Sequence, residues 1–167
     1  MINRALNTLE SGRVMRYHAA PTVTPQMLGH HAWGVAVIAL YLTGGNPSAE
    51  LLKACILHDA AELFTGDVPF SVKRDNLEAK AMYELLEAQA HANLVMELPD
   101  LTSSDQAILK LADTLEGLIW CYKNEREGPV THRWLHALKA GLEKFTQVLP
   151  QDILDRAMLL AMKPRTK

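Results

Sequence analysis

The sequence predicts an all-α fold: a single domain over residues 1–167, arranged as a bundle of about six to eight helices. Apolar residues recur three and four positions apart in most segments, as they do along one face of a helix. Glycine and proline stand mainly between these segments, where they end one helix and begin the next. No segment has the alternating pattern bounded by turn residues that is typical of strands, so we predict none.

The first half of the chain predicts three helices. Thr24-Pro25 and Asn46-Pro47 each place a capping residue before a proline, which suits the first helical position. Gly66 can adopt the left-handed conformation that closes a helix, and glycines also follow the other two segments. The expected helices cover about residues 2–11, 24–44 and 47–65.

The second half of the chain predicts four more helices. Asp75 or Asn76 can cap a long helix, and the run 102–104 (Thr-Ser-Ser) can cap the next. Pro150 separates the last two. The expected helices cover about residues 76–98, 103–128, 131–148 and 151–162.

Composition and charge narrow the classes of function. Apolar residues make up 49% of the chain and charged residues 22%, as in ordinary globular proteins. A formal charge of −2 disfavours binding to a nucleic-acid polymer. The longest apolar run, residues 33–42, is about half the ~20 residues that a membrane-spanning helix needs, so no membrane partner is expected. Since no signal-peptide pattern follows Met1, we expect a cytoplasmic location, the host cytoplasm if a phage encodes the chain.

Three ionisable residues lie near the end of the third predicted helix. Residues three and four apart share a helix face, so Glu62 is expected beside both His58 and Asp59. The apolar run 51–57 before them carries these groups toward the interior, where they need partners. A divalent cation would satisfy all three. For the His-Asp pair alone, a hydrogen-bonded helix end is the simpler alternative.

Two further segments of the chain favour the metal site over the hydrogen-bonded helix end. His31 opens the apolar second helix, and Asp113 stands within the otherwise apolar run 110–115. A histidine, then a His-Asp pair, then an aspartate on a later helix resembles the HD-domain phosphohydrolase superfamily, which implies a bundle of the HD-domain type. His132 and His136 have metal-site spacing but lack the glutamate of an HExxH site, and we interpret them as a polar strip.

The likeness is closer than this order of residues. Residues 58–69 resemble the signature of bacterial 5′-deoxynucleotidases and of small phage dATP triphosphohydrolases, and the likeness extends over about residues 12–127. It implies one divalent transition-metal ion, Co²⁺, Zn²⁺, Mn²⁺, Fe²⁺ or Ni²⁺, and it allows Mg²⁺ to accompany a triphosphate. The implied metal ligands are His31, His58, Asp59 and Asp113.

The resemblance also implies catalytic and substrate-binding roles. Glu62 matches a carboxylate that acts as acid and base on water, and Asp67 matches an acidic residue that orients its surroundings. Two positions depart from the pattern: His30 replaces an acidic neighbour of the first ligand, and Ser71 replaces a proline that borders the base. The implied substrate-binding residues are Arg16, Tyr17, His18, Trp33, Pro69, Ser71 and Lys73.

The function predicted first is a triphosphohydrolase that prefers dATP and releases deoxynucleoside and triphosphate. The alternative is a 5′-deoxynucleotidase acting on deoxyribonucleoside monophosphates, which would use the same metal ligands. A non-catalytic nucleotide-binding module ranks lower because all the ligands and the acid/base residue are present. A purely structural helical protein would leave the buried polar residues unexplained. The expected partner is a deoxyribonucleotide, and the expected assembly is a homo-oligomer, either a dimer or a hexamer.

Overall fold

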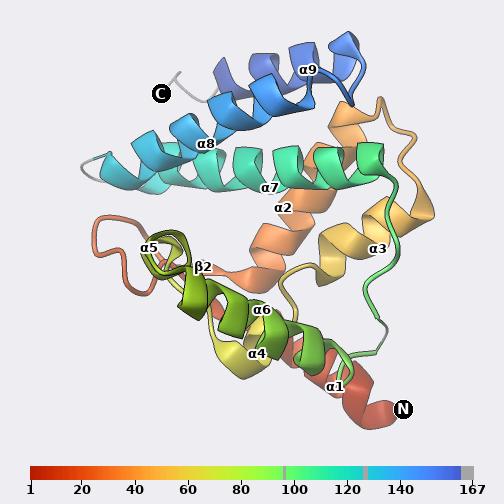
Figure 1. Ribbon diagram of the computed structural model, residues 1–167, viewed down its shortest axis with the longest axis vertical. Coiled ribbons are helices and arrows are strands. Elements are labelled where there is room, and N and C mark those ends of the chain that lie inside the picture. The colour runs from red at the N-terminus through yellow and green to blue at the C-terminus, as the bar shows by residue number, and fades with distance from the viewer. Residues whose placement is uncertain (96, 126–127, 163–167) are drawn as a thin grey trace.

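The all-α prediction is confirmed by the computed structural model, which describes residues 1–95, 97–125 and 128–162 (Figure 1). For Phe70, Ser71 and Arg74 it describes the backbone alone. Seven of the described helices have nine residues or more, within the predicted range, and α4 and α5 are shorter. The helices are α1 (Ile2–Ser11), α2 (Leu28–Leu42), α3 (Ala49–Leu57), α4 (Glu62–Thr65), α5 (Phe70–Asp75), α6 (Leu77–His91), α7 (Ser103–Asn124), α8 (Pro129–Phe145) and α9 (Gln151–Met162).

The core lies where α2 and α7 cross. In Figure 1, α7 runs across the middle of the molecule, with α8 and α9 on one side and α1, α4 and α6 on the other. α3 packs beside α2, and α8 packs along α7. Burying each leucine of this core stabilises the fold by about 1.5–3 kcal/mol, so the two central helices are firmly placed. Their fully buried residues include Val35, Ala39, Leu42, Leu111, Ala112, Leu115 and Leu118.

The predicted start of the second helix and the prediction of no strands are both wrong. Met15–Arg16 (β1) and Gln26–Met27 (β2) form a two-stranded antiparallel sheet, with Met15 opposite Met27. The Leu28 amide then donates to the Val14 carbonyl at 2.8 Å, so the chain stays extended until α2 begins. Strands of two residues are too short to show any alternation in the sequence.

The third predicted helix is interrupted. α3 begins after Ser48, whose side chain accepts from the Leu51 amide, and it ends at Leu57. Residues 58–61 form tight turns, and the one-turn helix α4 follows and closes at Gly66, where φ is 74°. His58, Asp59 and Glu62 therefore do not share one continuous helix face as predicted. In a regular helix the neighbouring side chains of His58 and Asp59 would point about 100° apart. In the turn, His58 Nε2 and Asp59 Oδ2 both lie within 3.6 Å of His31 Nε2.

The remaining boundaries shift by a few residues. α6 is capped by Asn76, which accepts from the Ala79 amide, and it ends at His91 because the chain turns inward to bury Leu94. α7 is capped by Thr102 and ends at Asn124, and α8 begins at Pro129. α5 was not predicted. No helix among the described residues combines the length and the apolar character needed to cross a membrane.

Candidate metal centre

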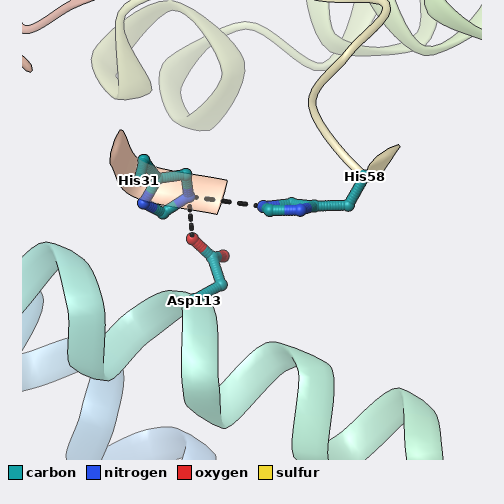
Figure 2. Close-up of side chains that lie close together, drawn as sticks. All are labelled: His31, His58 and Asp113. Carbon is teal, nitrogen blue, oxygen red and sulfur yellow. Dashed lines mark hydrogen bonds and ion pairs between the residues drawn. The ribbon is translucent and has the colours of Figure 1, made fainter. Parts of the chain in front are cut away.

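Three potential ligand side chains converge where three segments meet, and Asp59 lies beside them. His31 comes from the first turn of α2, His58 directly follows α3, and Asp113 lies midway along α7 (Figure 2). His31 Nε2 lies 3.3 Å from His58 Nε2 and 3.5 Å from Asp113 Oδ1. One ligand atom from each of these residues lies within 4.8 Å of the others. Asp59 Oδ2 lies 3.3 Å from His58 Nε2 and 3.6 Å from His31 Nε2, so it borders the same point.

The hydrogen bonds of the two histidines show that this arrangement fits a cation. The His58 Nδ1–H donates to the Cys55 carbonyl at 3.1 Å, and the His31 Nδ1–H donates to Glu116 at 2.5 Å. Both protons are thereby assigned to Nδ1, so both Nε2 atoms carry lone pairs. Two lone pairs that face each other beside two carboxylates repel unless a positive charge lies between them. Donors 3.3–3.6 Å apart match ligand bonds of about 2.0–2.2 Å to one ion.

The charges of the cluster oppose the effect of burial on its pKa values. Burial alone would raise the pKa of Asp59, but positive charge beside it, from protonated His58 in the metal-free protein and from Arg16, holds it below its usual range. Burial would also raise the pKa of Asp113, and Lys110 leads the groups that lower it. Lys110 Nζ binds Asp113 Oδ2 at 2.8 Å, which leaves Oδ1 turned toward His31. Both aspartates are therefore ionised, as metal ligands must be.

A cavity of about 240 Å³ opens beside these ligands. It is lined by carboxylates, by cations and by apolar or aromatic side chains, so it can hold a ligand with both charged and apolar parts. The charged residues of its lining are Arg16, Asp59, Glu62, Asp67, Lys73, Asp113 and Arg133. The apolar and aromatic residues are Tyr17, Ala19, Ala20, Val68, Pro69, Val130, Trp134 and Ala137.

Glu62 lines this cavity from the short helix α4. Burial, followed by the charges of Asp59 and Asp67, raises its pKa to about 9. Its buried Oε2 has no hydrogen-bond partner in the part of the chain that the structure describes. A carboxyl group that holds a proton near neutral pH is suited to proton transfer. Asp67 lies beside it and accepts from the Tyr17 amide at 3.1 Å, so it fixes the backbone at Tyr17.

The predicted substrate residues Arg16 and Tyr17 line the cavity from the end of β1. Arg16 is buried, its Nη1 donates to Gln26 Oε1 at 3.4 Å, and its Nε has no partner among the described residues. Tyr17 has a φ of 62°, an unusual conformation for a bulky residue, and its side chain packs against the buried cluster of Val23, Cys121 and Val130. Strain of this kind is typical of functional sites.

The other predicted substrate residues do not all lie at the cavity. Pro69 and Lys73 line the cavity, but Lys73 Nζ is paired with Glu87 of α6 at 2.8 Å. His18 is exposed beside Asp67 and does not belong to the lining. Trp33 is 66% exposed and also lies outside the lining, so the structure does not support its assignment to this cavity. Ser71 belongs to α5, but its side chain lies outside the described part of the chain.

Four residues that lie at the cavity or directly behind it were given no role in the sequence analysis. Arg133 and Trp134 of α8 line the cavity, and Glu116 and Gln26 are buried behind His31 and Arg16. Glu116 carried a signal, because it lies three residues after Asp113 on the same face of a mostly apolar helix. The other three carried none, since their positions depend on how distant segments pack.

Residues 5–153 match the model of a family described as 5′-deoxynucleotidase YfbR-like. The chain belongs to this family. It is therefore an HD-type, metal-dependent deoxynucleotide phosphohydrolase, which confirms the family and enzyme class predicted from the motifs. The match covers most of the described helices and all four potential metal ligands.

The relatives of this chain carry two different activity names. A dATP triphosphohydrolase of Salmonella phage PMBT28 is 32% identical over 148 residues, covering 81% of this chain and 73% of the relative. A 5′-deoxynucleotidase of Shewanella oneidensis is 29% identical over 137 residues, covering 69% of this chain and 70% of the relative. The HD phosphohydrolase DatZ of cyanophage S-2L, solved with dA and one catalytic Zn²⁺, shares the fold with a TM-score of 0.72 at 20% identity, covering 92% of this chain and 91% of that chain.

Proposed function

We propose that this phosphohydrolase is a deoxynucleoside triphosphate triphosphohydrolase that prefers dATP. The observation that carries the proposal is the cavity beside the ligand cluster, whose lining includes three cationic side chains, Arg16, Lys73 and Arg133. A triphosphate carries more negative charge than a monophosphate and gains more from several cations. The activity of the phage PMBT28 relative supports the same assignment.

In this proposal His31, His58, Asp59 and Asp113 hold one divalent ion. The ion, when bound, polarises the phosphoryl group and lowers the pKa of its water. Zn²⁺ is the first ion to test, because the cyanophage protein of the same fold binds a catalytic Zn²⁺. His31 and His58 are pre-set for ligation by the hydrogen bonds that fix their Nδ1 protons.

Side chains of the protein supply proton transfer, phosphate binding and contacts with the sugar or base. The positive charge of the ion would lower the pKa of Glu62 from its value of about 9 in the metal-free protein. The ionised carboxylate then takes a proton from the attacking water and returns it to the departing 5′ oxygen. Arg16 binds phosphate oxygens through its guanidinium fork, and Asp67 keeps the adjoining Tyr17 backbone in place. Tyr17 and Trp134 offer aromatic surfaces to the sugar or base.

The alternative, a 5′-deoxynucleotidase, breaks the same bond between the 5′ oxygen and the α-phosphorus. The two activities differ only in whether two more phosphates extend from the reacting phosphorus. The pairing of Lys73 with Glu87 favours this alternative, because it leaves one cation fewer for a phosphate tail. Several relatives named 5′-deoxynucleotidase also favour it.

Product analysis separates the two activities. Zinc-loaded protein is incubated with dATP, dGTP, ATP and dAMP, and the products are resolved by ion-exchange chromatography. We expect deoxyadenosine and intact triphosphate from dATP, with slower turnover of ATP. Accumulation of dAMP or dADP, or turnover of dAMP alone, would contradict the proposal. We also expect Ser71→Pro to raise the dATP-to-dGTP rate ratio if this residue borders the base.

Two further expectations belong to the proposal. The chain is expected to work as a homo-oligomer, a dimer or a hexamer, and in the cytoplasm, which is the host cytoplasm if a phage encodes it. Light scattering of the purified protein at several concentrations measures the number of subunits. A monomer at all concentrations would remove the first expectation.

A further inference from the structure

One buried carboxylate touches both the candidate metal centre and the candidate substrate arginine. Glu116 lies on α7 one turn after Asp113 and is 7% exposed. Its Oε2 accepts the Nδ1–H of His31 at 2.5 Å and lies 3.8 Å from Arg16 Nη1. Its Oε1 accepts from Gln26 Nε2 at 2.7 Å. Gln26 in turn accepts from Arg16 Nη1, so the four side chains form one connected network.

We infer that Glu116 is a positioning residue that couples the metal ligand His31 to the phosphate-binding Arg16. The coupling to Arg16 rests on the proposed function, in which this arginine contacts substrate. The coupling to His31 rests on the metal-ligand assignment alone. We call these two couplings the His31 arm and the Arg16 arm of the network. Neither arm depends on whether the substrate carries one phosphate or three.

The network requires a group that only accepts hydrogen bonds. His31 Nδ1, Gln26 Nε2 and Arg16 Nη1 all bring N–H groups toward Glu116, and an ionised carboxylate has acceptor sites for each of them. A glutamine at this position would turn an NH₂ group toward one of these donors. If Gln26 rotated to compensate, its own NH₂ group would then face Arg16. One buried donor would stay unpaired in either arrangement.

Gly34 supplies independent geometric support for this role. Gly34 lies in α2 one turn after His31, where glycine costs about 1 kcal/mol relative to alanine. A Cβ atom at this position would lie 2.7 Å from Glu116 Cγ and 3.2 Å from Oε1. The glycine thus leaves the space through which the Glu116 side chain reaches His31. Gly34→Ala would displace the carboxylate without changing its charge.

The two arms of the network make different predictions. Loss of the His31 arm leaves the imidazole free to rotate or to change tautomer, which typically weakens metal binding by about 10–100-fold. Loss of the Arg16 arm leaves the guanidinium without its anchor, which raises KM for the nucleotide. Glu116→Gln should disturb both arms. Gln26→Leu removes the hydrogen-bonded link to Arg16 and leaves only its longer, 3.8 Å contact with Glu116, but it keeps the bond between His31 and Glu116. It should therefore raise KM and leave metal affinity unchanged.

Zinc affinity of the metal-free protein is measured by competition with a chromogenic chelator, and KM and kcat are measured at saturating zinc. The substrate is whichever deoxynucleotide the parent protein hydrolyses, so failure of the triphosphate assignment does not affect the test. We expect Glu116→Gln to bind zinc about 10–100-fold more weakly and to show a raised KM. Gly34→Ala should weaken zinc binding in the same direction, and the exposed-site control Glu143→Gln should match the parent protein.

Circular dichroism and thermal unfolding establish that each variant is folded before these constants are compared. Should Glu116→Gln not fold, Gly34→Ala and Gln26→Leu carry the test by themselves. Parent-like zinc affinity in folded Glu116→Gln or Gly34→Ala would overturn the inference. A parent-like KM in Gln26→Leu would overturn it as well, because Arg16 would then not depend on the network.

Discussion

The two walls of the cavity are built in different ways. The wall that holds the potential ligands, the ligand wall, consists of His31, His58, Asp59 and Asp113, and two of these residues project from the crossing of α2 and α7 in the core. The other wall, the substrate wall, is formed by lining residues from three segments of the chain: Arg16, Tyr17, Ala19, Ala20, Asp67, Val68, Pro69, Lys73, Val130, Arg133, Trp134 and Ala137. These segments are a two-residue strand, turns, the short helix α5 and the first half of α8.

This difference separates what the fold fixes from what it leaves adjustable. His31 is fully buried, and core residues surround its helix, so a change of its position would disturb the whole bundle. The segment 67–73 of the substrate wall lies in a loop and the short helix α5, outside the core clusters, so it can change in sequence without disturbing α2 or α7. In our proposal the ligand wall sets the class of reaction, and the substrate wall sets which nucleotide is used.

The largest effect is expected from Asp113→Ala, which breaks the ligand wall. Asp113 of α7 places its Oδ1 atom 3.5 Å from His31 Nε2, and its carboxylate would offset the charge of the ion. We expect loss of bound metal and a fall in activity to the uncatalysed rate. Metal analysis by plasma mass spectrometry measures the first, and Asp100→Ala at an exposed site is the control. Undiminished metal content in the Asp113 variant would remove this residue from the metal site.

The next largest effect is expected from Glu62→Gln, which keeps the ligand wall and removes proton transfer. Glu62 lines the cavity, and its carboxyl group lacks a hydrogen-bond partner at Oε2 among the described residues. We expect normal metal content and a loss of about 100-fold or more in kcat. Turnover close to that of the parent protein would show that another group transfers the proton.

The ligand wall could be predicted from the sequence more fully than the substrate wall. Its four residues stand in or next to apolar helical runs, where each polar side chain is conspicuous. The break after Leu57 could not be predicted, because the helical spacing of apolar residues continues through it. Glu116 shows the same limit: its role depends on Gln26 and Gly34, which are 90 and 82 positions away in the sequence.

Of the substrate residues that the resemblance implied, some line the cavity and others do not. Trp33 lies two positions after His31, about 200° around the helix, so it faces outward when His31 faces inward. This could have been deduced from the sequence. Arg133 could not, because only the packing of α8 along α7 brings it to the cavity.

A smaller effect is expected from Arg133→Ala, which removes one cation from the substrate wall. Arg133 is an exposed cation at the cavity, and exposed charges contribute about 0.2–1 kcal/mol. We expect kcat/KM for dATP to fall about two- to fivefold, with metal content unchanged. Steady-state kinetics with dATP and dAMP measure the effect, and Lys139→Ala on the same helix is the control. Equal losses for both nucleotides would show that Arg133 does not contact the phosphate tail.

A separate effect concerns the stability of the metal-free protein and its dependence on pH. Burial and neighbouring carboxylates raise the pKa of Glu62 from 4.5 to about 9, so the folded state binds its proton more tightly than the unfolded state. Folding is therefore disfavoured progressively as pH rises through this window, and Glu62→Gln removes this contribution. Urea unfolding at about pH 5.5 and pH 8.5 should show the variant gaining stability relative to the parent protein at the higher pH. A constant difference between the two proteins would contradict the raised pKa.

The position of the bound ion tests the ligand wall most directly. Crystals of zinc-loaded protein are measured at the zinc absorption edge, and the ion is located from its anomalous signal. The account predicts one peak per chain at about 2.0–2.2 Å from His31 Nε2, His58 Nε2 and one oxygen each of Asp59 and Asp113. A zinc peak at full occupancy elsewhere, for example between His132 and His136, with none at this cluster, would contradict it.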